Sequence, residues 1–117
     1  MKGKIVLVSF PFDDLSGVKV RPALCLTDGI SPYHHVVIAF ITSQIQKAAE
    51  PSDLAILKTD RYFSQTGLKV DSAIRLHRLV TIPESLIQRQ LGNLPLTYQS
   101  VLNQKLRVLF ELETLDG

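Results

Sequence analysis

The sequence VRPALCL, residues 20–26, places an arginine-proline step directly before a run of apolar residues. A second apolar run, VVIAFI at residues 36–41, leads directly into the polar tripeptide TSQ at residues 42–44. Continuous apolar runs of this length, bounded by turn residues, are typical of strands covered on both faces. We therefore expect buried strands at residues 21–27 and 35–41. If the two strands are neighbours, Arg21 at the start of one and the hydroxyls at the end of the other converge.

Arg21 is the strongest candidate for a functional residue in these segments. Its place directly before Pro22 and a buried strand makes it rigid, which an exposed loop arginine, the alternative, does not need. Thr42 and Ser43 would add hydroxyl donors, with Gln44 as a weaker third member, although hydroxyls at a strand end also cap turns. Fixed donors beside a guanidinium suit a phosphodiester in a metal-free transfer reaction, because charge that builds on the phosphoryl oxygens needs preorganised donors.

The rest of the chain has the pattern of short strands followed by one helix. Residues 11–20 are rich in turn-forming residues and predict a loop. Further strand patterns cover residues 4–10, 54–58, 72–82 and 88–94. Between residues 98 and 110, apolar residues recur at three- and four-residue spacing, which predicts a closing helix with Thr97 as its N-cap. This order predicts a mainly β (α+β) fold, with a small curled antiparallel sheet covered by helices.

The length of 117 residues and the ordinary composition fit one compact domain covering residues 1–117. A net charge of +2 is too small for bulk electrostatic binding of nucleic acid. Basic residues nevertheless outnumber acidic ones between residues 61 and 107. This excess fits either a local basic groove for a nucleic-acid strand or basic side chains on solvent-exposed faces. No apolar run approaches the ~20 residues that span a bilayer. The single cysteine, Cys25, cannot form an internal disulfide, so we interpret it as a buried apolar residue and expect a cytoplasmic protein.

Metal and nucleotide-cofactor motifs are missing from the sequence, so we expect no cofactor and no metal site. His34 and His35 are sequence neighbours and would point to opposite faces of a strand, so they would not share an ion. Arg75 and His77 alternate within one predicted strand and therefore face the same side. They would supply a cation for a phosphate and an imidazole suited to general acid or base work. A solvent-facing side of a sheet that carries both residues is the alternative.

A series of short motifs along the chain is similar to that of a known toxin family. The motifs are GKIVLV at residues 3–8, FDDLSG at 12–17, VRP at 20–22, ITSQ at 41–44, GLK at 67–69, SAIRL at 72–76 and LVTI at 79–82. No single motif is decisive, but their order and spacing together are specific. Over almost its whole length the chain resembles the MazF/PemK toxins of type II toxin–antitoxin systems.

The resemblance implies a small SH3-like antiparallel β-barrel with a C-terminal helix. It also implies a metal-independent, sequence-selective endoribonuclease (an mRNA interferase) that cuts single-stranded RNA by attack of the 2′-OH, forms a homodimer and binds a cognate antitoxin protein. Arg21 and Thr42 match active-site residues of the family, and Arg75 matches an arginine that takes part in cleavage in PemK-like members. Those members have an acidic residue two positions later, where this chain has His77. We assign His77 the role of general base, and the alternative is that another group replaces the missing carboxylate.

The RNA contacts expected from the same resemblance lie around these residues. We expect RNA to contact Ser16, Lys19, Ser43, Gln44 and Arg78. Two other functions stay open from the sequence alone. One is a toxin of the same fold that binds DNA gyrase without nuclease activity, as CcdB does. The other is a catalytically silent module that binds RNA or the antitoxin, which is favoured by His77 and by Lys4, since Lys4 also replaces an often acidic residue.

Overall fold

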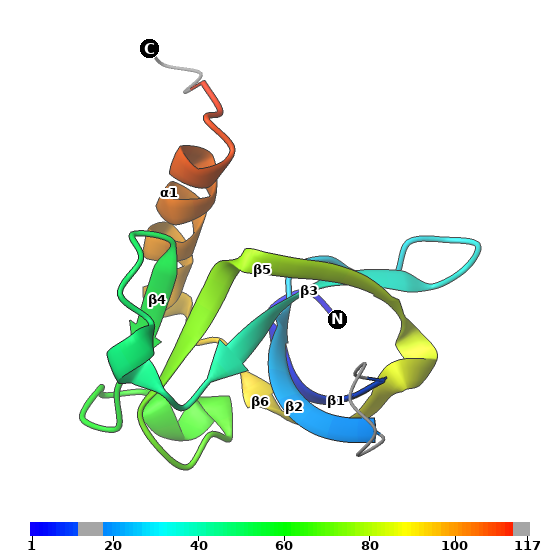
Figure 1. The fold of residues 1–117 in the computed structure, drawn as a ribbon, viewed down its shortest axis with the longest axis horizontal. Coiled ribbons are helices and arrows are strands. Elements are labelled where there is room, and N and C mark those ends of the chain that lie inside the picture. The colour runs from blue at the N-terminus through cyan, green and yellow to red at the C-terminus, as the bar shows by residue number, and fades with distance from the viewer. Residues whose placement is uncertain (12–17, 114–117) are drawn as a thin grey trace.

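The computed structural model describes residues 1–11 and 18–113, which form one antiparallel sheet with a helix beside its β4–β5 end (Figure 1). The strands are β1 (Lys4–Pro11), β2 (Val18–Cys25), β3 (His35–Thr42), β4 (Asp53–Ile56), β5 (Ser72–Pro83) and β6 (Ile87–Asn93). The helices are the short 3-10 turns η1 (Ile45–Lys47), η2 (Phe63–Thr66), η3 (Glu84–Leu86) and η4 (Leu96–Tyr98), and α1 (Gln99–Leu109). None of the helices in the described part of the chain is long and apolar enough to cross a membrane.

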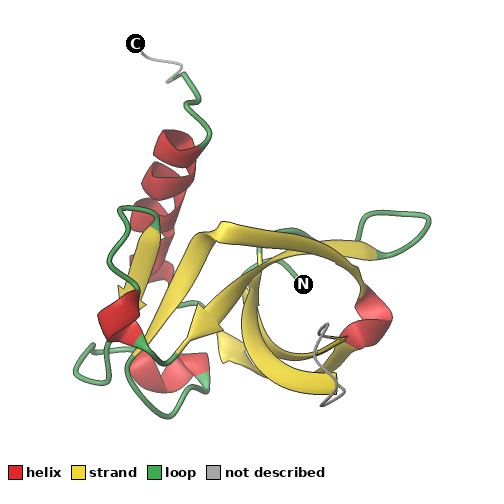
Figure 2. Ribbon diagram, in the orientation of Figure 1, coloured by secondary structure: helices red, strands yellow, loops and turns green. Residues whose placement is uncertain are grey.

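The sheet curls into a barrel-like shape without closing (Figure 2). Its strand order is β4-β5-β3-β2-β1-β6, and in the described residues the edge strands β4 and β6 do not pair with each other. The predicted mainly β, SH3-like antiparallel fold with a C-terminal helix is thus confirmed, with an open sheet in place of a closed barrel.

Successive residues of β2 and β3 pack into two separate hydrophobic cores. Leu24 and Ala39 lie in one core, which α1 covers with Leu102. Cys25 and Ile38 lie in the other core. Because neighbouring side chains of a strand point to opposite faces, both strands are covered on both faces, as their apolar runs predicted. Burial raises the pKa of the Cys25 thiol, as expected for a buried apolar residue that is not a nucleophile.

The strand β2 begins three residues earlier than its sequence pattern predicts. The predicted loop covers residues 11–20 and the predicted strand starts at Arg21, but the observed ladder pairs β1 with β2 from Val18 onward. This prediction is wrong because the strong turn-forming residues all lie at positions 12–17, outside the described residues, and residues 18–20 pair with β1. Arg21 therefore lies inside a strand, directly opposite Val8, on a backbone held by its neighbour.

The start of α1 differs from its prediction. Thr97 is not the N-cap, since it lies inside η4, and this 3-10 turn continues directly into α1 without a side-chain cap at Tyr98. The Tyr98 hydroxyl instead donates a hydrogen bond to Oδ2 of Asp60, whose carboxylate also accepts the Leu57 N–H at 2.8 Å. A side-chain contact with a distant turn thus fixes the start of the helix.

Removal of the Tyr98 hydroxyl should weaken the fold in a pH-dependent way. The hydrogen bonds from Tyr98 and Leu57 lower the pKa of Asp60, while burial and the nearby Asp60 raise the pKa of Tyr98. A carboxyl group whose pKa is lowered by folding stabilises the protein above its unfolded pKa, about 3.9, and this stabilisation is lost as the pH falls through the lower folded value.

We expect Tyr98→Phe to lower the free energy of unfolding by about 1 kcal/mol at pH 7, less than for a fully buried charged hydrogen bond because solvent screens Asp60. Urea titrations at pH 7 and at pH 3 check this expectation. The difference between variant and parent should shrink at pH 3, and an equal loss at both pH values would contradict a role for the ionised carboxylate.

Candidate functional site

The strands β2 and β3 separate where the arginine-proline step occurs. Their ladder covers only Ala23 to Cys25 of β2, which pair with residues 40 to 38 of β3. Continuing the same register would place Pro22 opposite Ile41 and Arg21 opposite Thr42. Proline has no N–H to donate to a ladder, and the pairing ends next to it. The predicted neighbourhood of the two segments is confirmed, and Arg21 and Thr42 lie on the two sides of the resulting gap.

The gap forms a small pocket of about 190 Å³. Its lining residues are Arg21, Phe40, Ile41, Thr42, Gln44, Arg75 and Arg78. Three of these carry guanidinium groups from two strands, β2 and β5, and they stand beside the hydroxyl of Thr42 at the end of β3. Fork-shaped cations beside a hydroxyl match the oxygens of a phosphate group in geometry and charge.

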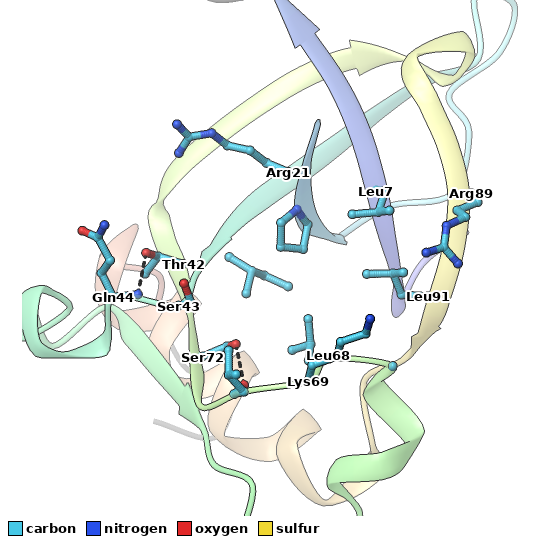
Figure 3. A pocket seen from close by; sticks show the side chains of 14 residues that line it. Leu7, Arg21, Thr42, Ser43, Gln44, Leu68, Lys69, Ser72, Arg89 and Leu91 are labelled. Carbon is cyan, nitrogen blue, oxygen red and sulfur yellow. Dashed lines mark hydrogen bonds between the residues drawn. The ribbon is translucent and has the colours of Figure 1, made fainter. Parts of the chain in front are cut away.

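The Thr42 hydroxyl lies at the turn that follows β3. Its Oγ1 accepts the N–H of Gln44 at 3.1 Å (Figure 3). This contact is the turn-capping role that hydroxyls at strand ends often have. A hydroxyl that accepts one hydrogen bond still has its own O–H to donate, so capping fixes the position of the side chain and leaves a donor for a ligand oxygen.

A wider groove of about 660 Å³ continues from Arg21 and Thr42 to residues 89 and 91 of β6. Its lining includes an apolar set of side chains, Leu7, Pro22, Ile41, Leu68, Val70 and Leu91. Figure 3 shows Arg21, Thr42 and Gln44 on one side of the groove, and Lys69 and Arg89 on the other. An apolar surface between two cationic sides suits a single strand of nucleic acid, whose bases need a stacking or packing surface and whose phosphates need cations.

Two glycines allow the second side of the groove to form. A Cβ on Gly67 would lie 2.1 Å from the Leu91 carbonyl oxygen, and a Cβ on Gly92 would lie 2.2 Å from the Gln65 carbonyl oxygen. Gly67 also has φ +72°, in the left-handed region that favours glycine. The backbone around η2 therefore lies directly on β6. This contact brings residues 68–69 next to residues 89–91, and both segments line the groove.

The bend of β5 brings its two arginines to one pocket. Arg75 and Arg78 are three residues apart, so a regular strand would point them to opposite faces. The pairing of β5 with β3 changes register between Ala39 and Ile41, so that β5 residues 75–78 lie between the two paired stretches. Both guanidinium groups consequently line the pocket with Arg21. The bend predicted from the interrupted apolar pattern is confirmed.

Arg75 is held by a carboxylate that the sequence did not single out. Asp53, the first residue of β4, pairs with Arg75 across the two strands, and Nε of Arg75 donates to its Oδ1 at 3.0 Å. The Asp53 side chain is only 3% exposed. An acid at the start of a short strand has no local pattern that marks it, and only the pairing of β4 with β5 shows its partner.

Residues 1–110 match the family of PemK-like, MazF-like toxins of type II toxin–antitoxin systems. The chain belongs to this family. None of the curated proteins matches the sequence significantly.

Solved structures of the MazF kind share the fold. The Mycobacterium tuberculosis toxin MazF-mt6 aligns with a TM-score of 0.72 and 22% identity, over 95% of this chain and 99% of that chain. An endoribonuclease from a mycobacterial species, in complex with its cognate antitoxin, aligns with a TM-score of 0.71 and 15% identity, over 97% of each chain. Another mycobacterial endoribonuclease aligns with a TM-score of 0.68 and 14% identity, over 97% of this chain and 93% of that chain. At these identities the likeness concerns the fold.

The structure places three of the four predicted catalytic residues of this MazF-like chain around one pocket, namely Arg21, Thr42 and Arg75. His77 lies elsewhere. Its Nδ1 is 2.7 Å from the Ser52 hydroxyl and 4.0 Å from Oδ1 of Asp53, and it is not among the residues that line the pocket or the groove. His77 and Arg75 do face one side of β5, as their alternation predicted, since both approach Asp53.

Some of the predicted RNA contacts line the pocket or the groove, and others do not. Ser43 and Gln44 line the groove, and Arg78 lines the small pocket. Lys19 is an exposed residue of β2, two positions before Arg21 and therefore on the same face of the strand, but it lines neither depression. Ser16 lies outside the described residues. The sequence reasoning missed Lys69 and Arg89 as site residues, although the excess of basic residues between positions 61 and 107 was a signal for them.

Proposed function

We propose that this toxin-family chain is a metal-independent endoribonuclease that cuts single-stranded RNA at the pocket between β2 and β3. The main support is the convergence of Arg21, Thr42, Arg75 and Arg78 around that pocket in a chain of the MazF/PemK family. Two of the similar structures are endoribonucleases. The proposed substrate is RNA and not DNA, because the reaction uses the ribose 2′-OH.

The proposed reaction is an internal transfer at phosphorus. The 2′-oxygen attacks the adjacent phosphorus while the bond from phosphorus to the 5′-oxygen breaks. The products are a 2′,3′-cyclic phosphate and a 5′-OH, so no water is consumed. A base takes the proton of the 2′-OH, and the leaving 5′-oxygen gains a proton. The transition state gathers negative charge on the non-bridging oxygens, which is the charge that the site must stabilise.

The roles of the side chains follow from their chemistry. Arg21 and Arg75 stabilise the developing charge, and since arginine stays protonated in proteins it does not serve as a proton donor. Thr42 donates its O–H to a non-bridging oxygen, with Ser43 beside it. His77, the base expected from the sequence, does not line the pocket, and its Nδ1 is engaged with Ser52, so we leave it out of the reaction.

Cleavage in the presence of EDTA tests the proposal. Purified protein is incubated with a long single-stranded RNA and with DNA of the same sequence, and the ends of the products are mapped. We expect discrete cuts in RNA with 2′,3′-cyclic phosphate and 5′-OH ends, and intact DNA. Intact RNA from protein that is shown to be folded would overturn the proposal in favour of a gyrase-binding toxin or a silent RNA-binding module.

The far side of the groove should bind the RNA backbone through Lys69 and Arg89. Each phosphate contact contributes about 0.7 to the slope of log affinity against log salt for a single strand. We expect the double change Lys69→Ala and Arg89→Ala to reduce this slope by about 1.4 and to raise KM, with kcat nearly unchanged. Fluorescence anisotropy with an uncleavable 2′-O-methyl RNA at several salt concentrations measures the slope.

A control for charge alone is the pair Lys2→Ala and Arg107→Ala, which removes two exposed cations that line neither the groove nor the pocket. This pair should leave the slope nearly unchanged. Equal slopes for both double variants would contradict a specific path of the RNA past Lys69 and Arg89.

The proposed partners are a cognate antitoxin and a second copy of the chain, in the cytoplasm. One of the similar structures contains an endoribonuclease with its cognate antitoxin, which supports the first partner. Light scattering after size exclusion tests the second. A mass of one chain at micromolar concentration would contradict the homodimer.

A further inference from the structure

Asp53 is a buried acid beside the proposed active site. Its side chain is 3% exposed, and transfer of a carboxylate out of water is unfavourable unless other groups pair with it. The Asp53 carboxylate accepts hydrogen bonds from a backbone N–H and from a side chain. The Glu50 N–H donates to Oδ2 at 3.0 Å, and the Arg75 guanidinium approaches the same carboxylate from the neighbouring strand.

The contact with Arg75 uses one edge of the guanidinium. Nε donates to Oδ1 at 3.0 Å, and Nη2 lies 3.5 Å from Oδ2. A guanidinium has five N–H donors in a rigid plane, so this contact leaves three of them, two on Nη1 and one on Nη2, for other partners. Arg75 also lines the pocket with Arg21 and Thr42. One edge of its head group thus contacts a fixed acid, while the side chain borders the pocket.

We propose that Asp53 is the positioning residue that orients Arg75 toward the phosphate, an inference that rests on the proposed RNA cleavage. A long arginine side chain loses rotamer freedom when it is ordered, and a charged partner on the next strand removes much of that freedom before the substrate arrives. The acid that contacts Arg75, Asp53, belongs to the neighbouring strand β4. On β5 itself, the position two residues after Arg75 holds His77. Its Nδ1 lies 4.0 Å from the same carboxylate, so Asp53 faces both residues.

Asp53→Asn tests the proposal with little change of shape. The amide can still accept the Glu50 N–H through its oxygen, but it lacks the charge that holds Arg75. We expect kcat to fall on the order of 10-fold and KM to stay within about 2-fold, because the lost orientation acts mainly in the transition state. Urea unfolding shows whether the variant is folded.

A double-mutant cycle separates this role from a general effect on the fold. Arg75→Gln can still donate a hydrogen bond to Asp53 and is the second arm of the cycle. If Asp53 acts through Arg75, adding Asp53→Asn to Arg75→Gln should lower kcat no further. If Asp53→Asn lowered kcat by the same factor in the parent protein and in Arg75→Gln, the proposal would be overturned. Ser52→Ala, which removes the partner of His77 but not of Arg75, is the matched control for the neighbouring contact.

NMR of the arginine Nε–H groups gives a readout that needs no RNA cleavage. In the parent protein the Arg75 signal, assigned by its absence in Arg75→Lys, should be protected from exchange with solvent. It should stay protected in Ser52→Ala and lose its protection in Asp53→Asn. An unprotected signal in the parent would overturn the positioning. A parent with a protected signal that cuts no RNA would overturn the proposed function while confirming that Asp53 holds Arg75.

Discussion

Arg21→Ala should lower RNA cleavage by at least about 100-fold while the protein stays folded. Loss of one preorganised donor to a developing oxyanion typically has an effect of this size. Arg21 borders both the pocket and the groove and lies across the strand gap from Thr42. Its backbone is fixed by the β1–β2 ladder, where it pairs with Val8, and its side chain is exposed and belongs to neither core. Truncation should therefore remove the cation without disturbing either core.

The measurement is kcat/KM on a short RNA that contains one cleavage site, with urea unfolding to confirm the fold. Arg107→Ala is the matched control, because it removes the same charge from an exposed position on α1 that does not line the groove or the pocket. It should cleave at nearly the parent rate. Arg21→Lys should recover only part of the activity, since lysine keeps the charge but lacks the planar fork. Near-parent cleavage by folded Arg21→Ala would contradict the assignment of Arg21.

The parts of the site that were predictable share one property: each depends on local sequence. The two apolar runs predicted strands with both faces buried, because side-chain alternation needs no knowledge of partners. The arginine-proline step and the hydroxyls after β3 were predicted to meet if the strands were neighbours, and the β2–β3 ladder places them across one gap. The sequence pattern of β5 predicted its bend as well.

The parts that were missed depend on pairing between distant segments. Asp53 was missed because it meets Arg75 only through the register of β4 with β5. Lys69 and Arg89 share a groove only because the chain around η2 lies on β6. The N-cap prediction failed for a similar reason, since Thr97 has the right residue type but Tyr98 reaches Asp60 in a distant turn. Residue type therefore suggests a role, while long-range contacts decide which residues fill it.

Gly92→Ala should destabilise the protein by about 3 kcal/mol, toward the upper end for added atoms in a packed site. The new Cβ would lie 2.2 Å from the Gln65 carbonyl oxygen and 2.5 Å from the Thr66 carbonyl carbon. These are backbone atoms, so no side-chain rotation relieves the overlap. The η2 turn is also held internally, because the buried Thr66 hydroxyl donates to the Phe63 carbonyl oxygen at 2.7 Å and accepts the Leu68 N–H at 3.1 Å. Either η2 or β6 must move.

The direction of that movement links stability to function. A shift of η2 away from β6 displaces Leu68 and Lys69 from the side of the groove that they form with Arg89, so the variant should also bind uncleavable RNA more weakly where it is still folded. The urea midpoint should fall by about 2 M for a slope of 1–2 kcal/mol per M. Gly29→Ala is the control, since its Cβ would have its nearest contact at 3.4 Å, with the flexible end of Glu84, and it should stay within about 0.5 kcal/mol of the parent. If Gly92→Ala were as stable as Gly29→Ala, the close contact between η2 and β6 would not be what forms this side of the groove.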